Sequence, residues 1–334
     1  MNRETIFGNH LPKGSINSAL RTFRRYSKKF LWDPEWKPVL TTNPMEKGYE
    51  IFGIETLVEN KAQPPAPLTL DRDKGVVIGT IRMGFGHYRI SLAMASAARS
   101  MGLTPYWLDY MAFPDSTSSR AIKSLEGMYN WASRLSQQFK LFNRFVWERI
   151  TSDMAQKLSY TPRDRELSRL FAPLCANLPG LENIITVVPD NYPLAFHLVE
   201  GSIHAVQTPS AYLGYRSLRN MGDEGQHLLN PIPEGQIRFV GHFVDHELVS
   251  NIELDCDRRF RRIHNHLTKR ILLTIGGAGA QVQRFLEIID YCNEAVSQEK
   301  LALFVNMGDH EGRWLELKAG LDARSIPYTL HTDW

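Results

Sequence analysis

The chain has 334 residues, of which 43% are hydrophobic and 22% are charged, and its formal net charge at pH 7 is +3. This length and composition allow two domains of ordinary size and exclude a disordered chain. The small net charge excludes a protein whose whole surface is built to bind nucleic acid.

The three cysteines, Cys175, Cys256 and Cys292, are odd in number and have no metal-ligand spacing. They exclude a disulfide framework and indicate a reducing compartment. Residues 1–14 lack the apolar core of a signal peptide, and no apolar run approaches the length of a membrane span. We therefore predict a cytoplasmic protein.

Residues 1–70 are predicted to be an N-terminal extension that contains a short basic amphipathic helix, which Pro34 stops. Its basic residues are Arg21, Arg24, Arg25, Lys28 and Lys29, and its apolar residues are Ile16, Leu20, Phe23, Phe30 and Leu31. Such a helix can lie on the inner face of an anionic membrane, or it can pack on the domain and expose its basic face to water. Residues 61–67, KAQPPAP, indicate an extended linker.

Residues 75–102 predict a buried strand, a glycine-rich turn and a helix, which Gly102 ends. Gly84 and Gly86 flank Phe85 in the turn, and a β-carbon at either glycine would restrict the close approach of a ligand. His87 follows at the start of the helix, where an imidazole can accept a proton near neutral pH. We predict that this unit opens a Rossmann-like domain at residues 71–245.

The same turn also allows a dinucleotide-binding interpretation, which two residues disfavour. The G-x-G-x-x-G fingerprint requires a small residue where this chain has Arg89, and no acidic residue ends a clear second strand, Asp109 being the nearest. A nicotinamide dehydrogenase is therefore a disfavoured alternative for the function of this chain.

Residues 116–171 predict a helical insert with many aromatic side chains. An aromatic stripe of this kind is more often core than ligand site. Arg134, Lys140, Arg144 and Arg149 lie between these aromatic residues, and this mixture also suits a ligand with an acyl tail at a membrane surface.

Four later segments continue the α/β pattern. Residues 182–193 form a β-branched run that ends in a turn with Asp190, which can be a base or only a turn former. Residues 203–210 predict a strand, and residues 236–245 predict a short strand that leads through Gly241 and His242 into a hinge. Residues 270–290 repeat the pattern of strand, glycine turn and helix, which predicts a second Rossmann-like domain at residues 246–334.

The ordered set of these motifs resembles the GT-B glycosyltransferases, in particular the monogalactosyldiacylglycerol synthases and the N-acetylglucosaminyltransferase that makes lipid II. The motifs in this chain are GFGH at 84–87, PD at 189–190, QTPS at 207–210, VGHFV at 240–244 and GGAGAQ at 276–281. The resemblance covers roughly residues 74–334 and implies two Rossmann-like domains with a cleft between them.

The resemblance implies inverting transfer of a sugar from a nucleotide-sugar donor, such as a UDP-sugar, to an acceptor that can be a lipid. It assigns His87 as the base, with Asp190 as the second candidate. Gly84, Phe85 and Gly86 would form the acceptor loop, and Gly241 and His242 the hinge. The donor diphosphate would bind at Gly276, Gly277, Gly279 and Gln281. It implies no cofactor and no nucleic acid.

The chain departs from the family pattern at three places. Phe243 replaces the proline of the interdomain turn, and Arg82 and Met83 stand where glycine is usual. The donor domain offers only three candidate strands, 271–275, 301–306 and 328–331, where such domains usually have about six. We therefore expect a fragment of a longer protein, a second chain that completes the donor domain, or a protein that has lost catalysis.

Two other classes of protein remain open. A nucleotide-sugar 2-epimerase shares the cleft and acts on the donor alone, and a non-catalytic homologue would only bind. No metal is predicted, because there is no Asp-x-Asp motif in a suitable loop and His197, His204, His242 and His246 lack zinc-ligand spacing.

Overall fold

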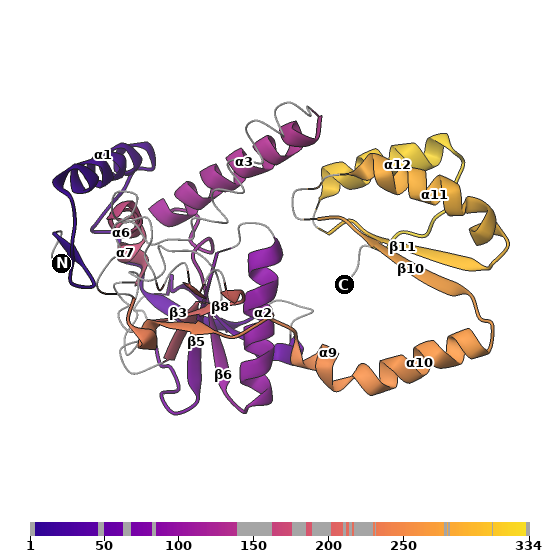
Figure 1. The fold of residues 1–334 in the computed structure, drawn as a ribbon, viewed down its shortest axis with the longest axis horizontal. Helices are drawn as coiled ribbons and strands as arrows, with labels where there is room; N and C mark the ends of the chain where they lie inside the picture. The colour runs from indigo at the N-terminus through magenta and orange to yellow at the C-terminus, as the bar shows by residue number, and fades with distance from the viewer. Residues whose placement is uncertain are drawn as a thin grey trace. The chain divides into compact units, whose positions relative to one another are not determined.

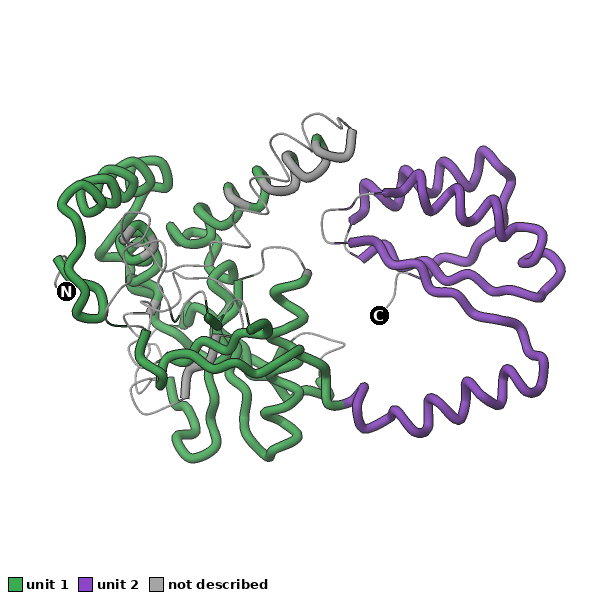
Figure 2. Tube along the Cα trace, viewed as in Figure 1, with its two compact units in different colours: residues 1–246 green, residues 247–334 purple. Residues whose placement is uncertain are grey.

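The computed structural model divides the chain into two compact units, residues 1–246 and residues 247–334 (Figure 2). The structure describes residues 4–45, 50–62, 68–81, 85–138, 162–175, 185–188, 202–209, 212, 213, 216, 230, 232–276, 279, 281–308 and 310–331.

Unit 1 is built on a seven-stranded sheet with the order β3-β4-β6-β5-β7-β8-β9. Its strands are β3 (Leu40–Pro44), β4 (Glu55–Glu59), β5 (Gly75–Thr80), β6 (Thr104–Asp109), β7 (Ile185–Val188), β8 (Ile203–Val206) and β9 (Ile237–Phe239). Strands β4 to β9 pair in parallel, and β3 pairs with β4 in antiparallel fashion at one edge. A small antiparallel pair, β1 (Thr5–Ile6) and β2 (Asn9–His10), precedes them.

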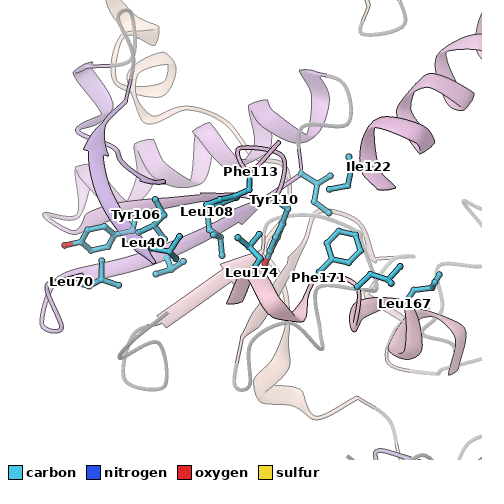
Figure 3. Packing of buried hydrophobic residues seen from close by; sticks show 14 of the residues in the cluster. Leu40, Leu70, Tyr106, Leu108, Tyr110, Phe113, Ile122, Leu167, Phe171 and Leu174 are labelled. Carbon is cyan, nitrogen blue, oxygen red and sulfur yellow. The ribbon is translucent and has the colours of Figure 1, made fainter. Parts of the chain in front are cut away.

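The helices of unit 1 cover both faces of this sheet (Figure 1). They are α1 (Lys13–Lys29), α2 (Phe85–Ser100), α3 (Thr117–Gln138), α6 (Pro162–Ser168) and α7 (Ala172–Cys175), and short 3-10 turns lie at Glu50–Phe52 and Glu234–Gln236. Tyr88 and Leu92 of α2 pack with Ile78 and Trp107 on one face. A larger core on the other face joins α1, α3 and α6 to the same strands (Figure 3). Parallel strands need such cover on both faces, which explains their almost continuous apolar runs.

The unit of β5 and α2 forms where the sequence predicts it. Strand β5 is buried from Val76 to Thr80, and α2 ends at the predicted glycine. Gly102 has a φ of 77°, and the amide of Leu103 donates to the Ala98 carbonyl, which closes the helix in a Schellman turn. The predicted mixed α/β class is thus confirmed, and the arrangement of two GT-B domains around a cleft stays a prediction.

Strands β3 and β4 are part of the sheet, and they correct the prediction that residues 1–70 lie outside the first domain. Strand β4 pairs with β6, and α1 packs against α6. Strand β3 is the edge strand and β4 lies next to it, and both segments, LTTNP and ETLVE, mix polar and apolar residues, so they lack the apolar run of a central strand.

The predicted helical insert at residues 116–171 is described only in part. Helix α3 covers its first part and α6 its last part, and Arg134 lies on α3, although its side chain is outside the described residues. Lys140, Arg144 and Arg149 also lie outside them. Ile122, Leu167 and Phe171 are buried in the core of Figure 3, so these ends of the insert serve packing.

Unit 2 contains a two-stranded parallel sheet of β10 (Lys269–Thr274) and β11 (Leu301–Asn306), as predicted for these two strands. Its helices are α9 (His246–Ser250), which begins at the last residue of unit 1, α10 (Ile252–His264), α11 (Val282–Ser297) and α12 (Glu311–Ala323). Helices α11 and α12 bury Phe285, Leu286 and Leu317 with the inner face of the strands. The third strand, predicted at 328–331, is wrong: this segment pairs with no described strand, and the Tyr328 ring packs on Trp314 instead.

Candidate functional site

The centre of the seven-stranded sheet is a topological switch point. Strand β5 lies between β6 and β7, so that the connection after β5 leads to one side of the sheet and the later connection to β7 leads to the other. Val77 of β5 has Tyr106 of β6 and Thr186 of β7 as its neighbours. In open α/β sheets, ligands bind beyond the carboxyl ends of the strands at such a point.

His87 lies in the first turn of the helix that follows β5. The side chain is half-buried, and the hydroxyl of Ser91 donates to the His87 carbonyl over 3.2 Å. The next residue, Tyr88, packs its ring on Trp107 with the centroids 5.0 Å apart, and this contact fixes the first turn of α2 against the sheet. The sequence therefore positions this histidine at the switch point through the packing of its neighbour.

Only the end of the predicted acceptor loop lies among the described residues. Gly84 and the side chain of Phe85 lie outside the described residues, and Gly86 is exposed in the first turn of α2. A β-carbon at Gly86 would meet nothing within 4 Å among the described atoms, so packing does not require glycine there. A glycine at this position would still allow a ligand to approach the backbone closely.

A buried hydroxyl ends the strand before this loop. Thr80 is 1% exposed, and its Oγ1 has no hydrogen-bond partner among the residues that the structure describes. Because side chains alternate along a strand, Thr80 lies on the same face as Ile78, which is the face that α2 covers. Sequence analysis did not single out this hydroxyl.

Helix α2 also holds the end of unit 1. The Arg89 guanidinium donates to Oδ2 of Asp245, which is buried, and the amide of His246 donates to Ser96 Oγ over 2.7 Å. Sequence analysis used Arg89 only as evidence against a dinucleotide site and missed Asp245. The sequence signal for this ion pair was Arg89 itself, because the G-x-G-x-x-G fingerprint needs a small residue at that position for close packing of the helix.

The other residues predicted for unit 1 are placed as follows. Asp190 lies outside the described residues, two positions after the end of β7 at Val188. Gly241 has a φ of 75°, and His242 is exposed in the segment between β9 and the end of unit 1. This segment has no regular secondary structure, as a hinge requires, and its function as a hinge stays a prediction.

The second glycine turn lies in unit 2 between β10 and α11. Gly276 follows the strand, Gly279 has a φ of 63°, and Gln281 has a φ of 74° at the N-cap of α11. Gly277 is outside the described residues. A side chain at a φ of this kind is uncommon and is found most often in turns and at functional sites.

A histidine and an arginine that sequence analysis missed lie over this turn. A β-carbon at Gly279 would be 3.1 Å from both His310 Nδ1 and Arg313 Cγ, at the start of α12. The turn after β10 and the helix after β11 therefore meet at the carboxyl edge of the small sheet. Only the parallel pairing of β10 with β11 brings these residues together, so no local sequence pattern could have found them.

The described residues of the two units hold no group of three or more histidine, cysteine or carboxylate side chains that could bind a metal ion. Among the helices in the described part of the chain, none is both long and apolar enough to cross a membrane.

Unit 1 is thus a doubly wound α/β protein with a mainly parallel sheet and a topological switch point at β5. A family model described as "Domain of unknown function (DUF6937)" matches residues 5–180 and 179–217, and the chain belongs to this family. A second model, "Domain of unknown function (DUF6938)", matches residues 232–334. No curated protein and no solved structure matches the chain.

Proposed function

We propose that this protein is a glycosyltransferase of the GT-B type that transfers a sugar from a UDP-sugar to an acceptor hydroxyl with inversion. The observation that carries the proposal is the position of the His87 turn at the switch point of the large sheet, where α/β proteins bind their ligands. The second strand, glycine turn and helix, in unit 2, supports it by offering a separate site for a diphosphate.

In the proposed reaction, His87 takes the proton of the acceptor hydroxyl as the oxygen attacks the anomeric carbon. The new carbon–oxygen bond forms while the bond to the donor phosphate breaks, and the nucleoside diphosphate leaves with the electron pair. A general base of this kind typically contributes a factor of about 10² to 10⁴ in rate. Asp190 remains the second candidate for this base.

The proposed donor site is the glycine turn of unit 2. Gly276, Gly279 and Gln281 precede α11, and the amino end of a helix attracts anions. His310 and Arg313 would add a hydrogen-bond donor and a positive charge next to the diphosphate. Arg313 also pairs with Glu316 over 2.5 Å, which holds its guanidinium at the start of α12.

A thermal unfolding series tests the donor site. UDP or a UDP-sugar at about 100 times its dissociation constant is expected to stabilise the folded protein by about 2.7 kcal/mol, whereas NAD has no effect. Gly276→Ala is expected to reduce this shift and to leave the unliganded protein as stable as before, because a β-carbon at Gly276 meets no described atom within 4 Å.

Gly279→Ala, in the same turn, separates loss of binding from loss of stability. This alanine would need a left-handed backbone and would press on His310, so we expect it to lower the unliganded stability as well. A chain that shows no shift with any nucleotide sugar would contradict the proposed function. A shift with NAD alone would favour a dehydrogenase, and conversion of the donor without an acceptor would favour an epimerase.

We propose an anionic membrane surface, and with it a lipid acceptor, as the partner of unit 1. Helix α1 buries Ala19 and Phe23 in the core, which excludes insertion of this apolar face into a bilayer. Its basic residues, Arg21, Arg24, Arg25, Lys28 and Lys29, are exposed. Lys29 donates to Ser124 of α3, a helix that also exposes Met128 and Trp131 at 61% and 59%.

Co-sedimentation with vesicles tests this partner. The full chain is expected to bind vesicles that contain phosphatidylglycerol at low salt and to be released as salt rises, since each basic residue contributes about 1 kcal/mol near such a surface. Arg24→Glu with Lys28→Glu should weaken binding more than about tenfold. The control is Lys269→Glu with Arg270→Glu, which changes the net charge by the same amount on an exposed strand of unit 2. Equal loss in both variants, or no binding at low salt, would contradict this partner.

A further inference from the structure

The segment that joins the two units, residues 240–246, is attached to unit 1 at its beginning. It follows β9 and leads into α9, and residues 241–244 within it have no regular secondary structure. The amide of Val240 donates to the carbonyl of Val206 in β8 over 3.0 Å. Val206 is buried, so this hydrogen bond connects the start of the segment to the core of the large sheet.

Helix α2 attaches the other end of the segment through two neighbouring residues. The Arg89 guanidinium donates to Oδ2 of Asp245. The amide of His246 donates to Ser96 Oγ over 2.7 Å. Arg89 and Ser96 are seven residues apart, about two turns of the helix, so both lie on the same side of α2. We call this pair of contacts the latch, and it fixes the end of the segment to the helix that carries His87.

The carboxylate of the latch is buried but only half paired. The Asp245 side chain is 8% exposed, and its Oδ1 has no hydrogen-bond partner among the residues that the structure describes. Arginine and carboxylate groups frequently form two parallel hydrogen bonds, whereas Arg89 binds Asp245 through one nitrogen. A buried carboxylate loses its hydration, and one bond returns only part of that free energy. The latch can therefore open readily, because its release returns the carboxylate to water.

We propose that the latch decides where the chain bends between the two units. While the latch is closed, residues 241–244 are held at both ends, so a rotation that reorients unit 2 has to occur after His246. When the latch opens, the rotation can begin at Gly241, whose φ of 75° favours glycine. The hinge predicted at Gly241 and His242 then acts only in the open state, and the latch limits the orientations that unit 2 can adopt.

Hydrogen exchange of the full chain tests whether the two contacts open together. The amide of His246 reports the closed state directly, because its acceptor Ser96 is 0% exposed. Arg89→Met removes the ion pair without changing that hydrogen bond, and it is expected to raise the exchange rate of the His246 amide at least about tenfold. Asp245→Asn should give a smaller increase, since the amide oxygen can still accept a hydrogen bond from Arg89.

Arg99→Met is the matched control, because Arg99 is exposed in the last turn of the same helix. It should leave the exchange rate of His246 within about twofold of the wild-type value. Residues 76–80 of β5 should keep their protection in every variant. Unchanged exchange of His246 in Arg89→Met would overturn the latch, since the two contacts would then be independent. Equal acceleration in β5 would also overturn it, because the ion pair would then stabilise the whole unit.

Spin-label distances test the effect on the bend. In a chain whose three cysteines are replaced by serine, labels are placed at Met101→Cys of unit 1 and Tyr291→Cys of unit 2, positions that are 74% and 91% exposed. The distribution of distances should be broader when Arg89→Met is added. An unchanged width, in a variant whose His246 exchange has risen, would overturn the proposal. None of these measurements uses a nucleotide sugar, so the inference does not depend on the proposed transferase activity.

Discussion

Replacement of His87 by alanine is expected to lower the rate of sugar transfer by about 10² to 10⁴-fold. The imidazole is assigned to take the proton of the acceptor hydroxyl, and alanine has no group that can do so. The free energy of unfolding should change by less than about 1 kcal/mol, because the side chain is only half-buried at the start of α2. Product formation from a UDP-sugar measures the rate, and circular dichroism at increasing urea measures the free energy of unfolding.

His10→Ala is the control for this experiment, since His10 is exposed in β2 and has no assigned function. It should keep the wild-type rate. A variant without His87 that retains at least half of the wild-type rate would contradict the assignment of the base, and Asp190→Asn would then be the next variant to measure. Loss of activity in both histidine variants would show that the assay reports folding rather than proton transfer.

Trp107→Ala is expected to have the largest effect on stability, a loss of about 3 to 5 kcal/mol. Trp107 is 1% exposed in the middle of β6 and packs with Ile78, Tyr88 and Leu92. Alanine would leave a cavity under the first two turns of α2, which the surrounding helix and strands can fill only in part. Urea unfolding of the purified variant measures the loss.

Trp131→Ala provides the matched control, because this tryptophan is 59% exposed on α3. It should change the free energy of unfolding by less than about 0.5 kcal/mol. A similar loss in the two variants would contradict the packing described for β6 and α2. Trp107→Ala should also lower activity in proportion to the fraction of the variant that is unfolded, because the unfolded chain does not hold His87 in place.

The sequence predicts secondary structure most accurately where the residues of one segment are sufficient to fix its conformation. Leu301–Asn306 forms β11 at the predicted bounds, and α11 begins after Gln281 as expected. The helix that carries His87 also follows from its local pattern, and it begins at Phe85, which places His87 in its first turn. In each case, the apolar period and the flanking glycines are properties of adjacent residues.

The prediction failed where a residue depends on a distant partner. The segment at 328–331 has the β-branched and aromatic residues of a strand, but no described strand pairs with it. Strands β3 and β4 lie in the segment predicted as an extension because they lack a continuous apolar run, and only the pairing of β3 with β4 and of β4 with β6 includes them in the sheet.

Local sequence is sufficient to predict the α/β class, the glycine turn before α11 and the helix that carries His87, because short-range periodicity and backbone freedom fix these features. The tertiary structure alone decided that β5 is the switch point, that Arg89 holds Asp245, and that His310 and Arg313 lie over Gly279. These contacts join residues that are far apart in the chain. Their formation depends on the order of strands in a sheet, which local sequence patterns do not encode.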